Sequence, residues 1–154
     1  MRLTVIGAVL ALSAMACGEK KNEQAQTPAA QPAAAQAAPA AAAGPVTEVK
    51  MTGTGTTAAF EPNAITIAPG ATVRFINVSG GPHNISFWGD SIPKGAADVL
   101  KKAMPEQITD LEGKLLVQPN EQYDITFAGA PTGVYKGYCL PHLALGMKIS
   151  ITVK

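Results

Sequence analysis

The sequence holds few of the residues from which metal centres and disulfide frameworks are built. Only two of its 154 residues are histidines, His83 and His142, and only two are cysteines, Cys17 and Cys139. If both histidines bind one metal ion, no histidine is left for a second metal centre. A disulfide would join Cys139 to a distant N-terminal segment, so we do not expect one to stabilise the fold.

Neither sign of charge is in excess. Residues 46–154 carry nine Lys and Arg side chains and nine Asp and Glu side chains. A surface that binds nucleic acid would need a concentration of basic residues, and this stretch provides none. We therefore expect no nucleic-acid partner.

The N-terminal apolar run, residues 3–12, is too short to cross a bilayer as a helix. It follows Arg2 and precedes the small residues Ala14-Met15-Ala16. This arrangement is typical of a secretory signal peptide, which we place at residues 1–16. The expected location is the periplasm or the extracytoplasmic face of a bacterial membrane.

Cys17 follows the apolar run in a position that resembles the lipobox of bacterial lipoproteins, whose cysteine is acylated and becomes the mature N-terminus. Lipoboxes usually carry leucine where this chain has Ala14, and Ala-x-Ala also suits ordinary signal peptidase. Ordinary cleavage would leave an exposed free thiol, so we favour lipidation of Cys17 and attachment to a membrane.

Residues 18–44 consist mainly of Ala, Pro and Gln. An alanine-rich helix is the alternative, but Pro28, Pro32 and Pro39 would interrupt it, and no apolar stripe offers a face for packing. We interpret residues 17–45 as a disordered tether between the lipidated cysteine and a folded domain at residues 46–154.

The folded domain reads as short segments rich in Val, Ile, Thr, Phe and Tyr, each closed by Gly, Pro or Asn, which is typical of an all-β sandwich or barrel. Apolar and polar residues alternate in several of these segments, which predicts one buried face for each. We predict strands at residues 47–52, 64–67, 72–76, 83–88, 122–127, 134–139 and 148–153.

Residues 89–113 break this pattern. Ala97, Leu100 and Met104 recur at helical spacing, and Pro105 would end a helix. We predict a short helix at residues 94–104, with a surface loop as the alternative, because isolated helices of this length are marginal in water.

Three potential metal ligands, Cys139, His142 and Met147, follow one another at Cys-x2-His-x4-Met spacing. Each has an ordinary explanation by itself: a buried thiol, a surface histidine or a methionine that fills the core. Together with His83, which the sandwich can bring alongside, they form the ligand set of a blue-copper site. Thiolate, imidazole and thioether suit copper and disfavour magnesium or calcium.

The motifs Pro82-His83-Asn84-Ile85 and Tyr138-Cys139-Leu140-Pro141-His142, with Met147, resemble the cupredoxins, and most closely plastocyanin and pseudoazurin. The resemblance covers residues 60–154. It implies a Greek-key β-sandwich or barrel of about eight strands with one type 1 copper. His83, Cys139 and His142 would bind the metal in a near-trigonal arrangement, with Met147 as the long axial ligand.

The resemblance implies a protein that shuttles single electrons between redox partners, expected to act as a monomer. A copper oxidase or nitrite reductase would need a second copper centre, so we do not expect an enzyme. A periplasmic copper carrier or chaperone stays open as an alternative, although Met51 and Met104 are not clustered. A metal-free structural domain also stays open, although the ligand set is intact.

The neighbours of the ligands carry two further expectations. Pro141 has no backbone N–H to donate to the Cys139 sulfur, which leaves Asn84 as the expected backbone donor.

Apolar side chains surround His142, and we expect redox partners to dock on them. These residues are Leu140, Leu143, Ala144 and Leu145. Residues 89–113 depart from the family pattern and the acidic cluster of plant plastocyanin is not evident, so the partner stays open.

Overall fold

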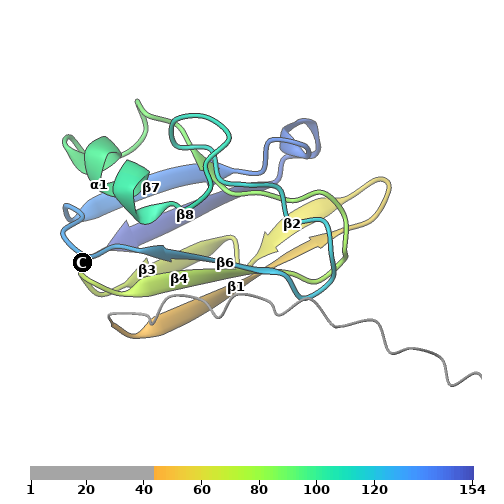
Figure 1. Cartoon of the computed structure of the whole chain (residues 1–154), viewed down its shortest axis with the longest axis horizontal. Helices are drawn as coiled ribbons and strands as arrows, with labels where there is room; N and C mark the ends of the chain where they lie inside the picture. Colours follow the sequence, from red (N-terminus) through yellow and green to blue (C-terminus); the bar gives the residue numbers. More distant parts are fainter. Residues whose placement is uncertain (1–43) are drawn as a thin grey trace, which may run out of the picture. The chain divides into compact units, whose positions relative to one another are not determined.

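The computed structural model describes residues 44–154. The predicted signal peptide, Cys17 and nearly all of the predicted tether lie outside the described residues. The described part contains eight strands, one α-helix and one turn of 3₁₀ helix (Figure 1). None of its helices has the length and apolar character needed to cross a bilayer.

The strands form two sheets of four, in the orders β2-β1-β4-β6 and β3-β8-β7-β5. β1 pairs with β4, and β3 with β8, in parallel, while the other neighbours are antiparallel. The helix α1 (Ala96–Ala103) lies between β5 and β6 in the chain, and the 3₁₀ turn (Leu143–Leu145) lies between β7 and β8. The strands are β1 (Val46–Gly53), β2 (Ala58–Glu61), β3 (Ala64–Ile67), β4 (Thr72–Asn77), β5 (Ser86–Phe87), β6 (Gln122–Thr126), β7 (Gly133–Tyr138) and β8 (Lys148–Val153).

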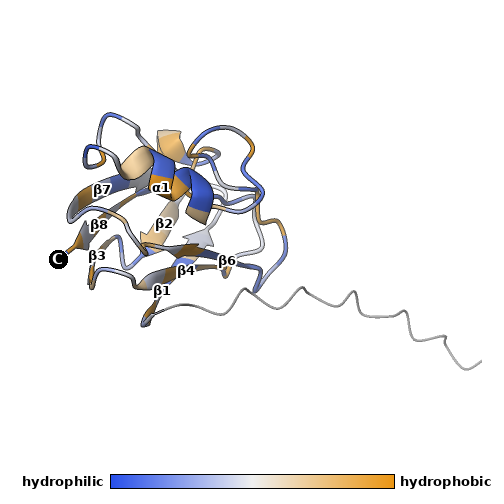
Figure 2. Cartoon of the chain, turned by 60° about the vertical axis from the view of Figure 1, so that its left-hand side comes forward, coloured by the Kyte–Doolittle hydropathy of each residue, from blue (hydrophilic) through white to orange (hydrophobic). Residues whose placement is uncertain are grey.

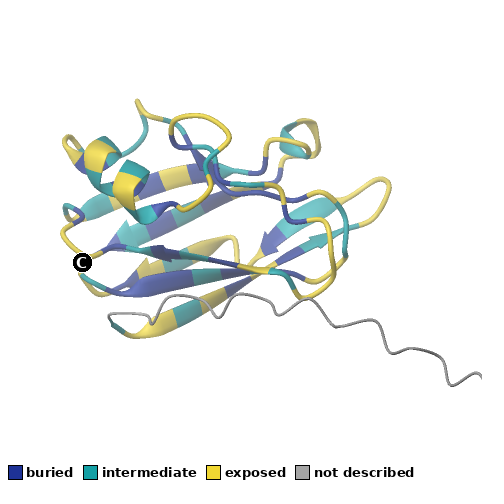
Figure 3. Ribbon diagram, viewed as in Figure 1, coloured by how far each residue is buried: buried dark blue, intermediate teal, exposed yellow. Residues whose placement is uncertain are grey.

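Alternating burial along the strands explains why the two sheets pack face to face. In β8, Ile149, Ile151 and Val153 are buried, while the residues between them are more exposed (Figure 3). Phe127 and Tyr135 connect the two sheets through edge-to-face rings whose centroids lie 5.2 Å apart. Burying one large apolar side chain contributes about 1.5 to 3 kcal/mol. The prediction of an all-β sandwich of about eight strands is confirmed.

Two strands differ from the sequence predictions. β2 was not predicted as a strand, because it has only four residues and Phe60 is its one fully buried side chain. The predicted strand at residues 83–88 shortens to β5, because residues 83–85 pair with the segment 113–116 instead of β7. His83 and Leu116 exchange backbone hydrogen bonds of 3.0 and 2.8 Å, and the Gly113 N–H donates to Ile85 O at 2.9 Å.

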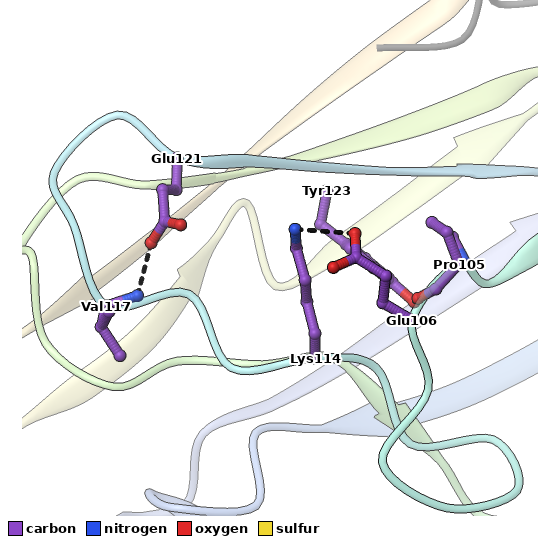
Figure 4. A network of polar contacts seen from close by, with 6 residues as sticks. All are labelled: Pro105, Glu106, Lys114, Val117, Glu121 and Tyr123. Atoms are coloured by element: carbon purple, nitrogen blue, oxygen red, sulfur yellow. Dashed lines mark hydrogen bonds and ion pairs between the residues drawn. The ribbon is translucent and has the colours of Figure 1, made fainter. Parts of the chain in front are cut away.

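The prediction of a short helix between β5 and β6 is confirmed by α1. Its apolar side, with Ala96 and Leu100 buried, faces the core, and its other side is hydrophilic (Figure 2). The segment after the helix is fixed by polar contacts (Figure 4). Tyr123 Oη donates to Pro105 O at 2.6 Å, and Lys114 Nζ lies 2.9 Å from a Glu106 carboxylate oxygen. A Glu121 carboxylate oxygen accepts the Val117 N–H at 2.5 Å.

Asn77 connects the end of β4 to both segments that hold His83. Its side chain is completely buried. Nδ2 donates to Gly81 O at 2.9 Å and to Leu116 O at 3.0 Å, and Oδ1 accepts the Gly80 N–H at 3.0 Å. One amide therefore satisfies three buried or partly buried backbone groups around the approach to His83.

Asn77→Ala should lower the free energy of unfolding by about 2 to 4 kcal/mol, because it leaves those backbone groups without partners. Urea denaturation of the purified protein, without added metal, measures the change. Thr54→Ala serves as the control. It removes a hydroxyl in an exposed turn, where Oγ1 contacts Thr57 Oγ1 and accepts the N–H groups of Thr56 and Thr57. Water can replace these exposed contacts, so the change should cost less than about 0.5 kcal/mol. A loss for Asn77→Ala no larger than that of the control would contradict this role.

Candidate metal centre

Three ligand atoms meet at one end of the sandwich. His83 precedes β5, Cys139 directly follows β7, and His142 lies on the loop between β7 and β8. Sγ of Cys139 is 3.8 Å from Nδ1 of His83 and 3.5 Å from Nδ1 of His142. One potential ligand atom from each of the three residues lies within 4.8 Å of the other two. A metal with bonds of about 2.0 to 2.3 Å separates neighbouring ligand atoms by about 3.5 Å. The cluster therefore has the dimensions of a metal site.

Met147 is buried on the same loop as Cys139 and His142. The loop closes on itself, because the Cys139 N–H donates to Met147 O at 3.1 Å and the Met147 N–H donates to His142 O at 3.2 Å. Gly146 has a left-handed backbone, with φ of 80°, which lets the chain reverse after the 3₁₀ turn. The structure thus gathers all four residues of the predicted ligand set at one end of the sandwich.

The His83 ring is buried and has close neighbours on more than one side. Its Nε2 is 2.8 Å from Oγ of Ser79, and it is completely buried. On another side lies Gly53 of β1, where an added Cβ would sit 3.1 Å from Cε1 of His83. A larger residue than glycine would therefore press on the ring. Burial, and secondarily the nearby His142, lower the pKa of His83 to about 4. The imidazole is neutral at ordinary pH, as a metal ligand must be.

Cys139 is completely buried, and burial raises the pKa of its thiol. Hydrogen bonds from the backbone N–H groups of Asn84 and His142 oppose this rise. Among the described residues, Cys139 forms no disulfide. In the absence of a metal the site therefore contains no ionised sulfur, and a metal ion must displace the thiol proton to bind.

Asn84 joins the two ligand-bearing segments through its buried side chain. Oδ1 accepts the Leu140 N–H at 2.8 Å, and Nδ2 donates to Gly113 O at 3.2 Å and to Ser86 Oγ at 3.3 Å. The residue next to His83 thus fixes the residue next to Cys139. Pro141, which has no N–H, is exposed.

Sequence reasoning missed three features of the site. Gly53 and Ser79 belong to no ligand motif, and only the folded structure brings them to His83. The His142 N–H, the second donor to the Cys139 sulfur, becomes visible only when the loop is seen to turn back on itself.

The fold and the site define a class of protein: a two-sheet β-sandwich with a buried metal centre of two imidazoles and one thiol at one end. Comparison with known families places the chain within this class. The model for copper-binding proteins of the plastocyanin/azurin family matches residues 47–154. The chain belongs to this family, and one type 1 copper is its cofactor.

Individual relatives of known sequence are also plastocyanins. Plastocyanin of Rumex obtusifolius is 37% identical over 107 residues, which cover 70% of this chain and 99% of that protein. Chloroplastic plastocyanin of Silene latifolia subsp. alba is 41% identical over 95 residues, or 62% of this chain, and the match spans about half (52%) of that protein.

Solved structures show the same fold. A Sinorhizobium pseudoazurin superposes with a TM-score of 0.53 at 30% identity, over 71% of this chain and 73% of that one. The oxidised plastocyanin of Dryopteris crassirhizoma gives a TM-score of 0.52 at 28% identity, over 70% of this chain and all (100%) of that one.

The contact between Ser79 and His83 leads to a prediction about metal affinity. If Nδ1 of His83 binds copper, its proton resides on Nε2 and can be donated to Ser79 Oγ, which orients the ring. Ser79→Ala should weaken Cu(II) binding about tenfold, measured by competition with a chelator. Ser79→Thr, which keeps the hydroxyl, should restore the affinity. Equal affinity of the alanine variant and the natural protein would show that the hydroxyl does not position His83.

Proposed function

We propose that this protein is a type 1 blue copper electron carrier, in which His83, Cys139 and His142 bind copper and Met147 is the axial ligand. The observation that carries the proposal is the convergence of the Cys139 sulfur and one ring nitrogen from each of two imidazoles within 4.8 Å in a largely buried site. Copper supplies the one-electron couple between Cu(II) and Cu(I). The protein would exchange single electrons with redox proteins of the cell envelope.

The surroundings of the ligands support electron transfer in preference to catalysis on a bound substrate. His83, Cys139 and Met147 are buried, and only His142 is partly exposed. Four side chains fill the coordination positions, so none is left open for a substrate, and the chain has no further histidine for a second centre. Asn84 and the closed loop hold the ligands in place, which keeps their rearrangement between oxidation states small.

Met51 and Met104 weigh against a copper carrier that would release Cu(I) through methionines. Both are buried in the core, at 0% and 3% exposure. Neither presents a thioether that could receive or pass on a metal ion at the surface. The carrier is therefore the less favoured alternative.

The proposal includes export through residues 1–16, a lipid anchor at Cys17 and a tether at residues 17–45, with the domain at residues 46–154 acting as a monomer. The support for export and anchoring is the N-terminal sequence pattern. Mass spectrometry of the mature N-terminus tests it, since an acylated Cys17 and a free thiol differ in mass.

Apolar residues around His142 support the proposed docking surface. Leu140, Ala144 and Leu145 are exposed, and Leu143 is half-buried beside the partly exposed His142. Exposed apolar side chains that gather at one place usually mark an interaction site. A partner docked on this end of the sandwich would approach copper through the His142 ring.

Addition of Cu(II) to the copper-free protein should produce intense visible absorption from thiolate-to-copper charge transfer. Cys139→Ser, which changes one buried atom, should abolish this absorption and leave circular dichroism unchanged. Colourless binding of Cu(I) alone would indicate the carrier instead. A failure to bind either ion would indicate a structural domain.

Leu145→Glu should slow electron self-exchange between the Cu(I) and Cu(II) forms at least about tenfold, because like charges would meet at the docking surface. NMR line broadening measures the rate. Val134→Glu is a matched control, since both side chains are 45% exposed and Val134 lies at the start of β7, whose other end leads to Cys139 and His142. Visible absorption should be unchanged in both variants. Equal slowing in both would remove the support for docking at His142.

A further inference from the structure

The 105–116 segment joins the edge strands β5 and β6, which belong to different sheets. At the start of the segment, Tyr123 of β6 donates its hydroxyl to Pro105 O at 2.6 Å (Figure 4). The rest of the segment is joined to residues 83–87, which include β5, by backbone hydrogen bonds of 2.8 to 3.0 Å. One contact to β6 and several to the His83 strand therefore fix the segment between the two sheets.

Gly113 is the point at which the segment touches both of its neighbours. Its N–H donates to Ile85 O at 2.9 Å. A Cβ added to Gly113 would lie 2.9 Å from Ile85 O and 2.9 Å from Cε1 of Tyr123, which is closer than real side chains approach. Glycine therefore allows the segment to lie against the backbone of Ile85 and the tyrosine ring at the same time.

The carbonyl of Gly113 connects the segment to the candidate metal ligands. It accepts a hydrogen bond from Nδ2 of Asn84 at 3.2 Å. The oxygen of the same amide, Oδ1, accepts the Leu140 N–H at 2.8 Å, and Leu140 directly follows Cys139. The position of the Gly113 carbonyl therefore helps to set the orientation in which Asn84 holds the loop that bears Cys139.

Two residues of the segment have a left-handed backbone, which is unfavourable for residues with a side chain. Glu106 and Leu111 have φ of 50° and 63°. Glu106 directly follows Pro105, whose carbonyl accepts the tyrosine hydroxyl. The Leu111 N–H donates to Oε1 of Gln107 at 3.0 Å. Such a backbone persists only where surrounding contacts fix it, so the shape of the segment depends on these two hydrogen bonds.

The hydroxyl of Tyr123 is the stronger of the side-chain contacts that hold the start of the segment. Tyr123 is 3% exposed, and burial, with a smaller effect of Glu106, raises the pKa of its phenol, so the hydroxyl keeps the proton that it donates. Lys114 also pairs with Glu106, at 2.9 Å, but the Glu106 side chain is 68% exposed. Exposed ion pairs contribute little, whereas a buried hydrogen bond is costly to lose.

We propose that Tyr123 and Gly113 are positioning residues for the metal centre. Tyr123 fixes the 105–116 segment, and Gly113 within that segment fixes the amide of Asn84. Asn84 in turn fixes the loop that bears Cys139. The inference rests on the proposed function for its consequence, which is that copper keeps its affinity and reduction potential because partners beyond the ligands hold them in place. The coupling from Tyr123 to this loop is a property of the protein before any metal binds.

The alternative is that Tyr123 only stabilises the core, and a second tyrosine separates the two possibilities. Tyr135 of β7 is also buried, and its hydroxyl also donates to a proline carbonyl, Pro131 O, at 2.5 Å. Pro131 precedes β7, and the other end of β7 leads to Cys139. Tyr135→Phe is therefore a matched control for Tyr123→Phe, because it removes the same atom and the same kind of hydrogen bond away from the metal centre.

Amide hydrogen exchange of the full chain without metal, followed by NMR, tests the coupling independently of electron transfer. Tyr123→Phe should speed exchange of the Gly113 and Leu140 N–H groups at least about fivefold more than exchange of the slowest core amides, which report global unfolding. Tyr135→Phe should speed all of these amides by one common factor. The same ratio in both variants would overturn the proposal, because it would mean that Tyr123 contributes stability alone.

The second measurement uses the protein loaded with copper. Tyr123→Phe should raise the Kd for Cu(II) about threefold and shift the reduction potential, whereas Tyr135→Phe should change neither. Gly113→Ala should raise the Kd about tenfold, because its Cβ would displace the carbonyl that Asn84 binds. An unchanged Kd and potential in Tyr123→Phe would contradict the positioning role.

Two outcomes are kept apart by this design. If circular dichroism shows that Gly113→Ala does not fold, the comparison of the two tyrosine variants decides the question by itself. If the natural protein does not bind copper, the proposed function is wrong, and the exchange measurement still decides whether Tyr123 is coupled to the loop that bears Cys139.

Discussion

The metal end of this protein depends on one constraint: a thiol and two imidazoles must be held close together in a largely buried place. Burial raises the pKa of Cys139 and lowers that of His83, so both groups are neutral before a metal arrives. Such a site is stable only if each polar atom has a partner. Asn84 supplies much of this, because it joins the His83 segment to the Cys139 loop.

The same constraint makes the two histidines unequal. His83 is enclosed by the backbone of Gly53 and by the hydroxyl of Ser79, and no part of its ring reaches solvent. His142 lies on the short loop between β7 and β8, where no strand covers it, and stays partly exposed. In the proposed site, the enclosed imidazole would hold the ligands in place, and the partly exposed one would be the ligand nearest to a surface partner.

Sequence patterns were sufficient where a feature is local. Alternation along β8 predicts its buried face, and the spacing of Cys139, His142 and Met147 places three ligands on one loop. Features that depend on packing between distant segments were not predictable. The strand after His83 divides because a loop takes over its hydrogen bonds, and Ser79 meets His83 only through the turn that Asn77 fixes. Tyr123 meets Gly113 only through the packing of β6 against the 105–116 segment.

The strand β7 and the loop that follows it determine which part of the metal end faces solvent. Buried and more exposed residues alternate along β7, and the chain continues directly from the half-buried Tyr138 to the buried Cys139. The loop that follows turns away to form the apolar end around His142. A neutral apolar surface selects partners by shape and contact area, because it has no charge to steer them. The exposed Leu140, Ala144 and Leu145 beside the partly exposed His142 therefore favour selection by contact area at the proposed docking surface.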